Sequence, residues 1–443
     1  MTRQKRPALG PTILNWVRER GIDWRGLSKE TGIPQGTISA HWTRHLADTD
    51  KANKALASYQ AKHPPIPTPE EAFEERTETQ ALKDKITGLE SELRVAAREK
   101  NLRDMLWELA KSTAPKLPHA APLWTPEKPS KTQIVETAYQ LLSDLHAYES
   151  VSAERTRGHN EYTHQVMAAR VGQLVATHIS IINRLREGGW RFEELALGLG
   201  GDNVSGTIHD LERHSDAQNV VLAVYGCAWL IAQAVRELSR HYKKVYAYGV
   251  GGNHARLPDA KKKQMKDPTR TWDYMIYLMV REMLREQENV EFWFPDSWGA
   301  QVNIRGWNVL LGHGDDIRSW AGIPWYGIKR RTTQMQALEA ARGNPIHYQM
   351  LAHFHTQANI PYPAGETLIN GSVIGGTEFS VDGLGECEPP KQWLVAFHER
   401  HGMTHRWPLV LEPQEADIPK FTTTPWLDVQ RRTDASPPIW KVA

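Results

Sequence analysis

The hydrophobic and polar positions between residues 134 and 412 follow two alternating patterns. Short, mostly apolar runs, of which IVETAYQLL at 134–142 is the first, predict buried strands. Longer stretches with apolar residues three or four positions apart, such as 162–188, predict amphipathic helices. Further strands are expected at 194–201, 244–252, 290–294, 300–306, 307–312, 347–355, 366–372, 391–400 and 403–412, and further helices at 220–242, 271–287 and 327–343. Strands that alternate with helices in this way indicate a layered α/β body.

Residues 1–62 have the pattern of a small all-α module. An expected helix with Trp24 and Leu27 on its apolar side ends at Gly32, and Pro34 suits the first turn of a second helix. This arrangement is similar to a helix-turn-helix, and the module has eleven Lys and Arg against five Asp and Glu, a net charge of +6. If the module binds DNA, its second helix would present Gln35, Thr37, Ser39, His41 and Arg44. The alternative is a small helical domain that docks another protein.

Proline-rich linkers are expected at 63–72 and 113–133, on either side of a long helix at 73–112. Within this helix, a short heptad seam over residues 82–96 is formed by Leu82, Ile86, Leu89, Leu93 and Ala96. The seam is explained either by a coiled coil that pairs two chains into a homodimer or by one amphipathic helix packed on its own body. An extended, proline-rich tail is expected at 413–443.

The amino-acid composition indicates a cellular compartment but says less about the function. The chain has 443 residues, a net charge of only +2 and two cysteines, Cys227 and Cys387, which cannot build a disulfide framework. We therefore expect a reducing compartment, the cytoplasm. No apolar run approaches the roughly 20 residues that span a bilayer, so no membrane contact is expected.

Side chains that can bind a metal stand where the apolar strands end. Five motifs occur in this position: D-x-H at 144–146, G-D at 201–202, G-N-H at 252–254, H-G-D at 313–315 and H-x-H at 353–355. Strand ends are where α/β proteins place functional groups. In the first motif, the i, i+2 spacing would put both side chains on one side of an extended strand. Buried carboxylates and imidazoles need partners, and several of them crowded together demand a cation.

The donor groups are too numerous for one tetrahedral site. Seven side chains qualify, namely Asp144, His146, Asp202, Asn253, His313, His353 and His355. Mixed oxygen and nitrogen donors without cysteine suit two divalent cations that share a bridging carboxylate. Mn²⁺ is the first expectation, with Fe, Zn and Mg as alternatives. Two cations about 3.5–4 Å apart activate water for in-line attack on a phosphoryl group, so the expected reaction is metal-dependent hydrolysis of a phosphoester.

The order of these five motifs resembles the calcineurin-like metallophosphoesterase superfamily over roughly residues 134–411. The resemblance implies an α/β/β/α sandwich, here at residues 134–412 and preceded by the helix-turn-helix-like module and the long helix. It implies that the first cation is held by Asp144, His146, Asp202 and His355. It also implies that Asp202 bridges to a second cation, whose site is completed by Asn253, His313 and His353.

The same resemblance implies two further roles. His254 would face the scissile phosphate and stabilise or protonate the leaving oxygen, and Arg256 would contact phosphate. The chain departs from the family pattern by having Ala255 after G-N-H, Ala352 before H-x-H and Ser143 before the first aspartate, and GDNVSG lacks the second acid of G-D-x-x-D. No departure removes an expected ligand, but the surroundings that set metal preference differ. Outside the motifs, two residues soon after Asp202 are candidates to reach the cleft, His209 and Asp210.

A DNA nuclease combines these features best, with the basic module holding DNA and a coiled coil pairing two catalytic bodies. Superfamily nucleases of double-strand-break repair offer a similar logic, and phage-encoded relatives share the strand motifs, which places the protein in a bacterial or phage-infected cell. One alternative is an enzyme that acts on small nucleotides, other phosphodiesters or phosphoproteins, with the module docking a protein. The other is a DNA-binding or assembly protein with a structural metal site, against which the complete ligand set and His254 argue.

Overall fold

The computed structural model describes most of the expected α/β body and little outside it. The described residues are Arg25, Glu108, 111–112, 114–125, 133–205, 220–257, 267–317, 324–385, 387–412 and 418–423. By its contacts, the chain divides into one unit of Met1–Glu92 with Gln430–Ala443 and another of Leu93–Val429. The helix-turn-helix-like module, its DNA-facing side chains and the seam at 82–96 lie outside the described residues, as do His209 and Asp210.

The first sheet has six strands and contains the first three motifs at its edge. In spatial order they are β11 (Gly402–Val410), β10 (Lys391–His398), β1 (Ile134–Leu142), β2 (Trp190–Leu199), β3 (Lys244–Gly249) and β4 (Val290–Trp293). The four strands from β1 to β4 run parallel, whereas β10 is antiparallel to β1 and to β11. The carboxyl ends of β1, β2 and β3 therefore meet at one edge.

The second sheet has five strands, in the order β5 (Gly299–Ile304), β6 (Trp307–Gly312), β7 (Tyr348–Leu351), β9 (Gly365–Ile369) and β8 (Ala358–Tyr362). β6, β7 and β9 run parallel, and β5 and β8 are antiparallel edge strands. The sequence pattern did not predict β8, because Pro361 interrupts it. At the edge of a sheet a proline is tolerated, since no neighbour needs its missing N–H.

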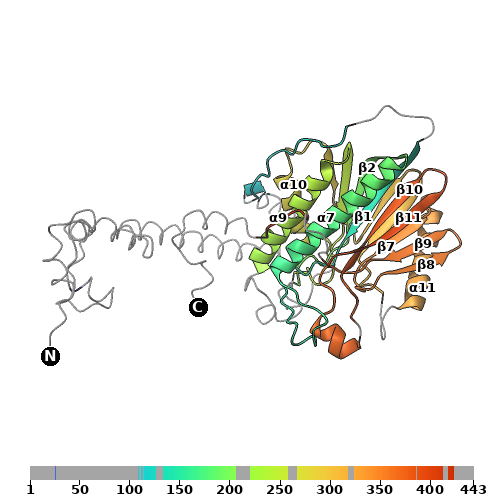
Figure 1. Cartoon of the computed structure of the whole chain (residues 1–443). Coiled ribbons are helices and arrows are strands. Elements are labelled where there is room, and N and C mark those ends of the chain that lie inside the picture. The colour runs from blue at the N-terminus through green and yellow to red at the C-terminus, as the bar shows by residue number, and fades with distance from the viewer. Residues whose placement is uncertain are drawn as a thin grey trace, which may run out of the picture. The chain divides into compact units, whose positions relative to one another are not determined.

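The two sheets pack face to face, and helices cover their outer faces (Figure 1). Alternate residues of β1 show this directly: Tyr139 and Leu141 pack toward the second sheet, whereas Ala138 and Leu142 pack toward the helices. The helices on the first sheet are α7 (His164–Glu187), α9 (Val220–Ser239) and α10 (Trp272–Met283). On the second sheet, Ile328 of α11 (Trp325–Ala341) packs on Leu351 and Ile369, and a short π-helix, η1 (Phe379–Leu384), precedes β10. The described residues thus form the expected α/β/β/α sandwich.

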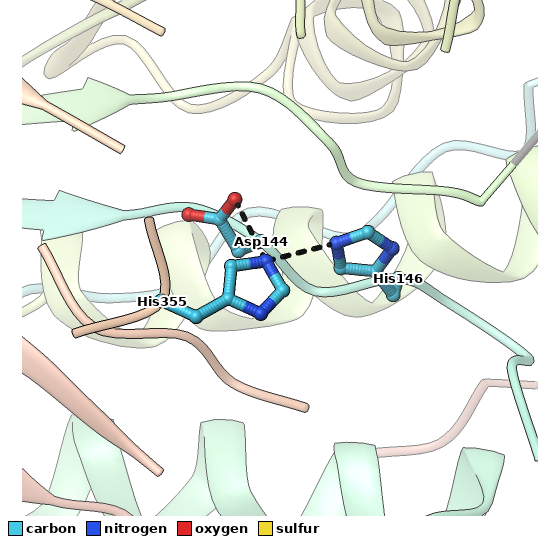
Figure 2. Close-up of side chains that lie close together, drawn as sticks. All are labelled: Asp144, His146 and His355. Atoms are coloured by element: carbon cyan, nitrogen blue, oxygen red, sulfur yellow. Dashed lines mark hydrogen bonds and ion pairs between the residues drawn. The ribbon is translucent and has the colours of Figure 1, made fainter. Parts of the chain in front are cut away.

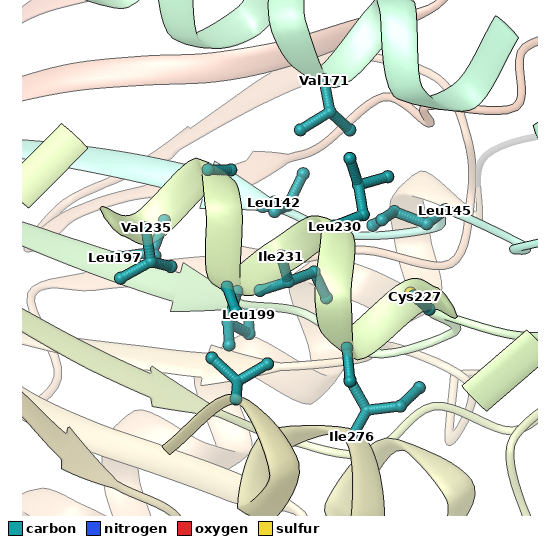
Figure 3. Packing of buried hydrophobic residues seen from close by; sticks show 14 of the residues in the cluster. Leu142, Leu145, Val171, Leu197, Leu199, Cys227, Leu230, Ile231, Val235 and Ile276 are labelled. Atoms are coloured by element: carbon teal, nitrogen blue, oxygen red, sulfur yellow. The ribbon is translucent and has the colours of Figure 1, made fainter. Parts of the chain in front are cut away.

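Helix α9 is the centre of the larger core (Figure 3). Cys227, Leu230 and Ile231 are fully buried among residues of β1, β2, α7 and α10. By length and composition, α9 is the one helix of the described part that is apolar enough to cross a membrane, which corrects the expectation that no such run exists. Its burial within the core explains the apolar composition without a membrane.

Segments from the expected linker and tail pack on the α/β body. Residues 114–125 lie against the ends of α9 and α10, where Leu117 N–H donates to Met283 O at 2.9 Å. Residues 418–423 cross the helices near Gly226 of α9, where a Cβ would come within 2.4 Å of Thr423 O. Thr422 O accepts a hydrogen bond from Gln233 Nε2 at 2.7 Å. The described parts of both segments therefore belong to the packed body.

Candidate metal centre

The seven expected ligands lie together where strands of both sheets end. Asp144, Asp202 and Asn253 follow β1, β2 and β3, and His313 and His353 follow β6 and β7. Two hydrogen bonds join these loops across the sheets: His313 Nδ1 donates to Gly200 O at 2.8 Å, and His353 N–H donates to Asp144 Oδ1 at 3.2 Å. The carboxylates and imidazoles form two groups, Asp144–His146–His355 and Asp202–His313–His353. Within each group, the possible ligand atoms lie within 4.8 Å of one another.

Five of the seven side chains stand on left-handed backbone. The φ angles are +54° at Asp144, +46° at His146, +51° at Asp202, +73° at His353 and +57° at His355. This conformation costs a residue other than glycine roughly 1–2 kcal/mol, and its concentration at one place is typical of a functional site. It also corrects the reasoning for D-x-H, because neither residue is extended. The turns, and not a shared strand face, bring Asp144 and His146 together.

The first group consists of one carboxylate and two imidazoles (Figure 2). Nε2 of His355 lies 3.4 Å from Asp144 Oδ1 and 3.3 Å from His146 Nε2. In the neutral ring of His146, the hydrogen lies on Nδ1. Ser205 Oγ donates its own hydrogen to Glu149, and Ser205 Oγ therefore accepts a hydrogen bond from His146 Nδ1 at 2.9 Å. Nε2 of His146 is then left to face the group. Burial opposes a charged His146, but Glu149, Asp202 and Asp144 outweigh it and raise the pKa to about 9.

The second group is centred on the buried carboxylate of Asp202. Its Oδ2 lies 2.9 Å from His313 Nε2, which is also 3.1 Å from Asn253 Oδ1. His353 packs against His313, with ring centroids 5.1 Å apart. Burial lowers the pKa of His353 to about 4, with a smaller contribution from His313. His353 therefore presents a neutral imidazole at neutral pH, the form that binds a metal.

The contacts of His313 fit a cation. Because Gly200 O can only accept, His313 donates from Nδ1, and a neutral ring would turn the lone pair of Nε2 toward two oxygens. Three acceptors facing one another repel unless a proton or a metal lies among them. Burial opposes a proton on His313, but Asp202 and Asp144 raise its pKa to about 10. The site thus attracts positive charge, and its oxygen and nitrogen donors suit divalent cations.

His254 lies beside both groups without belonging to either. Its backbone N–H donates to Asp202 Oδ1 at 2.8 Å, and its ring centroid is 4.8 Å from that of His146. Burial lowers the pKa of His254 to about 4, so the ring is neutral at neutral pH. A neutral imidazole still has one N–H with which to stabilise an oxygen that gains negative charge.

Arg256, two residues after His254, contacts an acidic and an aromatic side chain through its guanidinium group. Its guanidinium forms an ion pair with Asp315 and stands 4.5 Å from the centroid of the Trp298 ring. Asp315, the acid of the H-G-D motif, thus fixes an arginine and lies outside both candidate metal groups. The contact between Arg256 and phosphate remains a prediction.

Sequence reasoning missed several residues that hold the ligands in place. Glu149 lies 3.4 Å from His146 Nδ1, and its position three residues after the D-x-H motif was a usable signal. Below Asp144, the side chains of Ser143, Asn370 and Gln392 form a buried network, in which Ser143 Oγ donates to Asp144 Oδ2 at 2.6 Å. Asn370 directly follows β9, so the strand-end rule applied to this strand would have found it.

The sequence matches no family model, and no curated protein matches it. The fold is similar to a predicted phosphoesterase from Streptococcus pneumoniae (8% identity, 62% of this chain and 98% of that chain, TM-score 0.26). It is also similar to an archaeal phosphodiesterase (10% identity, 61% and 99%, TM-score 0.27) and to Vps29 of Entamoeba histolytica in complex with zinc (11% identity, 62% and 99%, TM-score 0.26). Identities and TM-scores this low show a similarity of fold alone.

Proposed function

We propose that this protein is a hydrolase that uses two divalent cations to cleave phosphodiester bonds, and that its substrate is DNA. The observation that carries the proposal is the meeting of seven expected ligands from five strand ends: six form two groups, and Asn253 lies beside the second group. Asp202 belongs to one group, and its charge also raises the pKa of His146 in the other. A carboxylate that belongs to one group and acts electrostatically on the other is a suitable candidate for a bridging ligand.

The residues divide the chemistry between them. Asp144, His146, Asp202 and His355 would hold one cation, and Asp202, Asn253, His313 and His353 the other. When bound, the two cations would polarise the phosphoryl group and lower the pKa of water, which supplies the nucleophile at neutral pH. His254, oriented by its bond to Asp202, donates its ring N–H to the oxygen that leaves. Mn²⁺ is the proposed metal because mixed carboxylate, amide and imidazole donors suit it; Fe, Zn and Mg are the competing choices.

The choice of DNA is supported by the basic N-terminal module and its helix-turn-helix-like sequence. A net charge of +6 within residues 1–62 favours a polyanion, and phosphates of a duplex supply one. The α/β body does not distinguish DNA from small phosphodiesters as the substrate, because the same metal chemistry hydrolyses both. The proposed homodimer, through residues 82–96, would set two catalytic bodies on one duplex.

The test compares full-length protein with two variants on a panel of substrates. Plasmid, single-stranded and double-stranded oligonucleotides and bis-(p-nitrophenyl) phosphate are incubated with Mn²⁺ or with chelator. His254→Asn removes the proposed donor to the leaving oxygen. His401→Asn is the matched control, because His401 lies in the β10–β11 turn at the opposite end of the sheet.

We expect Mn²⁺-dependent cleavage of DNA by the wild type and His401→Asn, and a rate lower by about 10²–10⁴-fold for His254→Asn. Retained, salt-sensitive DNA binding by His254→Asn would assign the loss to chemistry. Cleavage of bis-(p-nitrophenyl) phosphate or nucleotides without any cleavage of DNA would support the proposed phosphodiesterase activity and contradict the proposed nuclease activity. Equal rates with and without chelator would overturn the metal-dependent reaction.

A further inference from the structure

The first turn of α10 places a fully buried carboxylate behind the metal centre. Thr271 caps this helix by accepting from Tyr274 N–H at 3.1 Å, and Asp273 is its second residue. A negative charge is favoured in the first turn by the helix dipole. The carboxylate of Asp273, however, is directed to two loops outside its own helix, those that follow β2 and β3.

Asp273 accepts four hydrogen bonds and each of its oxygens receives two. Oδ2 accepts from the backbone N–H groups of Asp202 at 3.0 Å and Gly252 at 2.8 Å. Oδ1 accepts from Asn203, from the backbone N–H at 3.0 Å and from Nδ2 at 2.7 Å. One side chain thereby fixes both the loop that carries Asp202 and the loop that carries Asn253 and His254.

The contact with Asp202 acts on the backbone that aims its carboxylate. Asp202 is left-handed, with φ of +51°, and its own Oδ1 accepts from His254 N–H at 2.8 Å. The bond from Asp202 N–H to Asp273 at 3.0 Å helps to offset the cost of this unfavourable backbone conformation. The loops also lack space to adjust, since a Cβ at Gly201 would lie 2.4 Å from Gly252 N.

We infer that Asp273 is a positioning residue of the metal centre, which holds the bridging ligand and the Asn253–His254 loop in one arrangement. It touches neither cation nor substrate and acts through Asp202 and Gly252. This inference rests on the proposed function, because it assigns Asp273 a role in the binding of the second cation.

The role requires a carboxylate and excludes an amide. All four partners of Asp273 are donors, and an asparagine has only one acceptor oxygen. In Asp273→Asn, the amide NH₂ would therefore face two donors at one of the oxygen positions. Removing such a partner leaves buried N–H groups without an acceptor, which is costly.

Tyr277→Phe supplies a matched control from the same helix. The Tyr277 hydroxyl, one turn after Asp273, accepts from Asn203 Nδ2 at 3.0 Å and donates to Val250 O at 2.9 Å. It is as deeply buried as Asp273 and shares the partner Asn203. Its other contacts are with Leu199 O at 3.4 Å and with the backbone of Gly201, so it touches the same two loops but is hydrogen-bonded to neither Asp202 nor Gly252 among the described residues. A loss of general packing or of the Asn203 contact would affect both variants, whereas a loss of ligand position affects Asp273→Asn.

The experiment measures Mn²⁺ binding to full-length wild type, Asp273→Asn and Tyr277→Phe by calorimetry and elemental analysis, with thermal unfolding in chelator to verify folding. We expect two ions per chain in the wild type and Tyr277→Phe. In folded Asp273→Asn, we expect the second ion to bind about 10–100-fold more weakly, as for other residues that orient metal ligands. Two ions at wild-type affinity in Asp273→Asn, or equal losses in both variants, would overturn the inference.

Two further outcomes keep the conclusions separate. A wild type that binds fewer than two ions would contradict the proposed function itself, whatever the variants do. If Asp273→Asn does not fold, Asp273→Glu decides, since it keeps two acceptor oxygens but displaces them by one methylene. We then expect a folded protein with weakened binding of one ion, and wild-type binding of both ions would overturn the positioning role.

Discussion

Nε2 of His313 lies 2.9 Å from Oδ2 of Asp202, while the other ring nitrogen of His313 donates to Gly200 O. The same pair would hold a proton in metal-free protein and a cation in loaded protein. Burial disfavours the proton, but Asp202 raises the pKa of His313 to about 10, and Glu149 and Asp202 raise that of His146 to about 9. Since both values lie above neutrality, both imidazoles are protonated at about pH 7 when no metal is bound.

Metal binding should therefore release protons. A metal binds the deprotonated ring, so loading at about pH 7 is expected to release about two protons per chain, from His146 and His313. Between about pH 7 and 9, below both pKa values, affinity should rise about tenfold per pH unit for each proton displaced. Calorimetry with Mn²⁺ in buffers of different ionisation enthalpy measures the number. A heat of binding that does not change with the buffer would contradict the protonated state.

Glu149 should tune the affinity of the first group. Its carboxylate lies 3.4 Å from His146 Nδ1 and accepts from Ser205, and it fixes the tautomer that leaves Nε2 for the metal. Burial raises the pKa of Glu149, but the contact with His146 outweighs it and lowers the pKa to about 2. For Glu149→Gln we expect Mn²⁺ affinity lower by about 10–100-fold. Titration of Mn²⁺ into the exposed control Glu154→Gln should reproduce the wild type, and an unchanged Glu149→Gln would contradict the role.

The network below Asp144 should contribute mainly to stability. Asn370 donates to Ser143 Oγ at 2.9 Å and to Gln392 Oε1 at 2.6 Å, and it accepts from Trp393 N–H at 3.0 Å. Asn370→Ala leaves these buried groups without partners, which should lower the free energy of unfolding by about 3 kcal/mol. Denaturant unfolding in chelator measures this change without a contribution from bound metal. Asn183→Ala, on the exposed face of α7, should change it by less than about 0.5 kcal/mol. A similar small change for Asn370→Ala would show that the network does not stabilise the fold.

The alternation of strands and helices and the positions of the expected ligands at strand ends could be predicted from the hydrophobic pattern, whereas the two-sheet sandwich was implied by the family resemblance. A run such as IVETAYQLL determines where β1 ends, and Asp144 follows from that end. Parallel pairing of β1, β2 and β3 then brings their ends to one edge, whatever the details of the loops. Strand β8 was not predicted, because it contains Pro361 and only an edge strand tolerates a proline. A single sequence does not show which strand lies at the edge of its sheet, as β8 does.

The residues that orient the ligands could not be predicted, because their contacts join distant parts of the chain. Asp273 is 71 positions from Asp202, and on a helical pattern an aspartate in the first turn is explained by the helix dipole alone. Likewise, the left-handed backbone at Asp144 and His146 could not be predicted, because neither position is a glycine, the residue that usually indicates this conformation. The extended geometry assumed for D-x-H is therefore wrong, although the two side chains do lie in one candidate group.

Gly252 of the G-N-H motif is packed closely against Asp202. A Cβ at Gly252 would lie 2.1 Å from Asp202 Oδ1 and 2.5 Å from Asp202 N, so Gly252→Ala must displace the proposed bridging ligand. The control is Gly312→Ala, which also precedes a proposed ligand but would meet only Leu351 Cδ2, at 3.8 Å. We expect Gly252→Ala to lose Mn²⁺-dependent hydrolysis of bis-(p-nitrophenyl) phosphate by at least about 10²-fold, since misplacement by about 1 Å has this effect. Gly312→Ala should stay within a few-fold of the wild type. Equal activity of Gly252→Ala and Gly312→Ala, with both folded, would show that the carboxylate of Asp202 is not held where the reaction needs it.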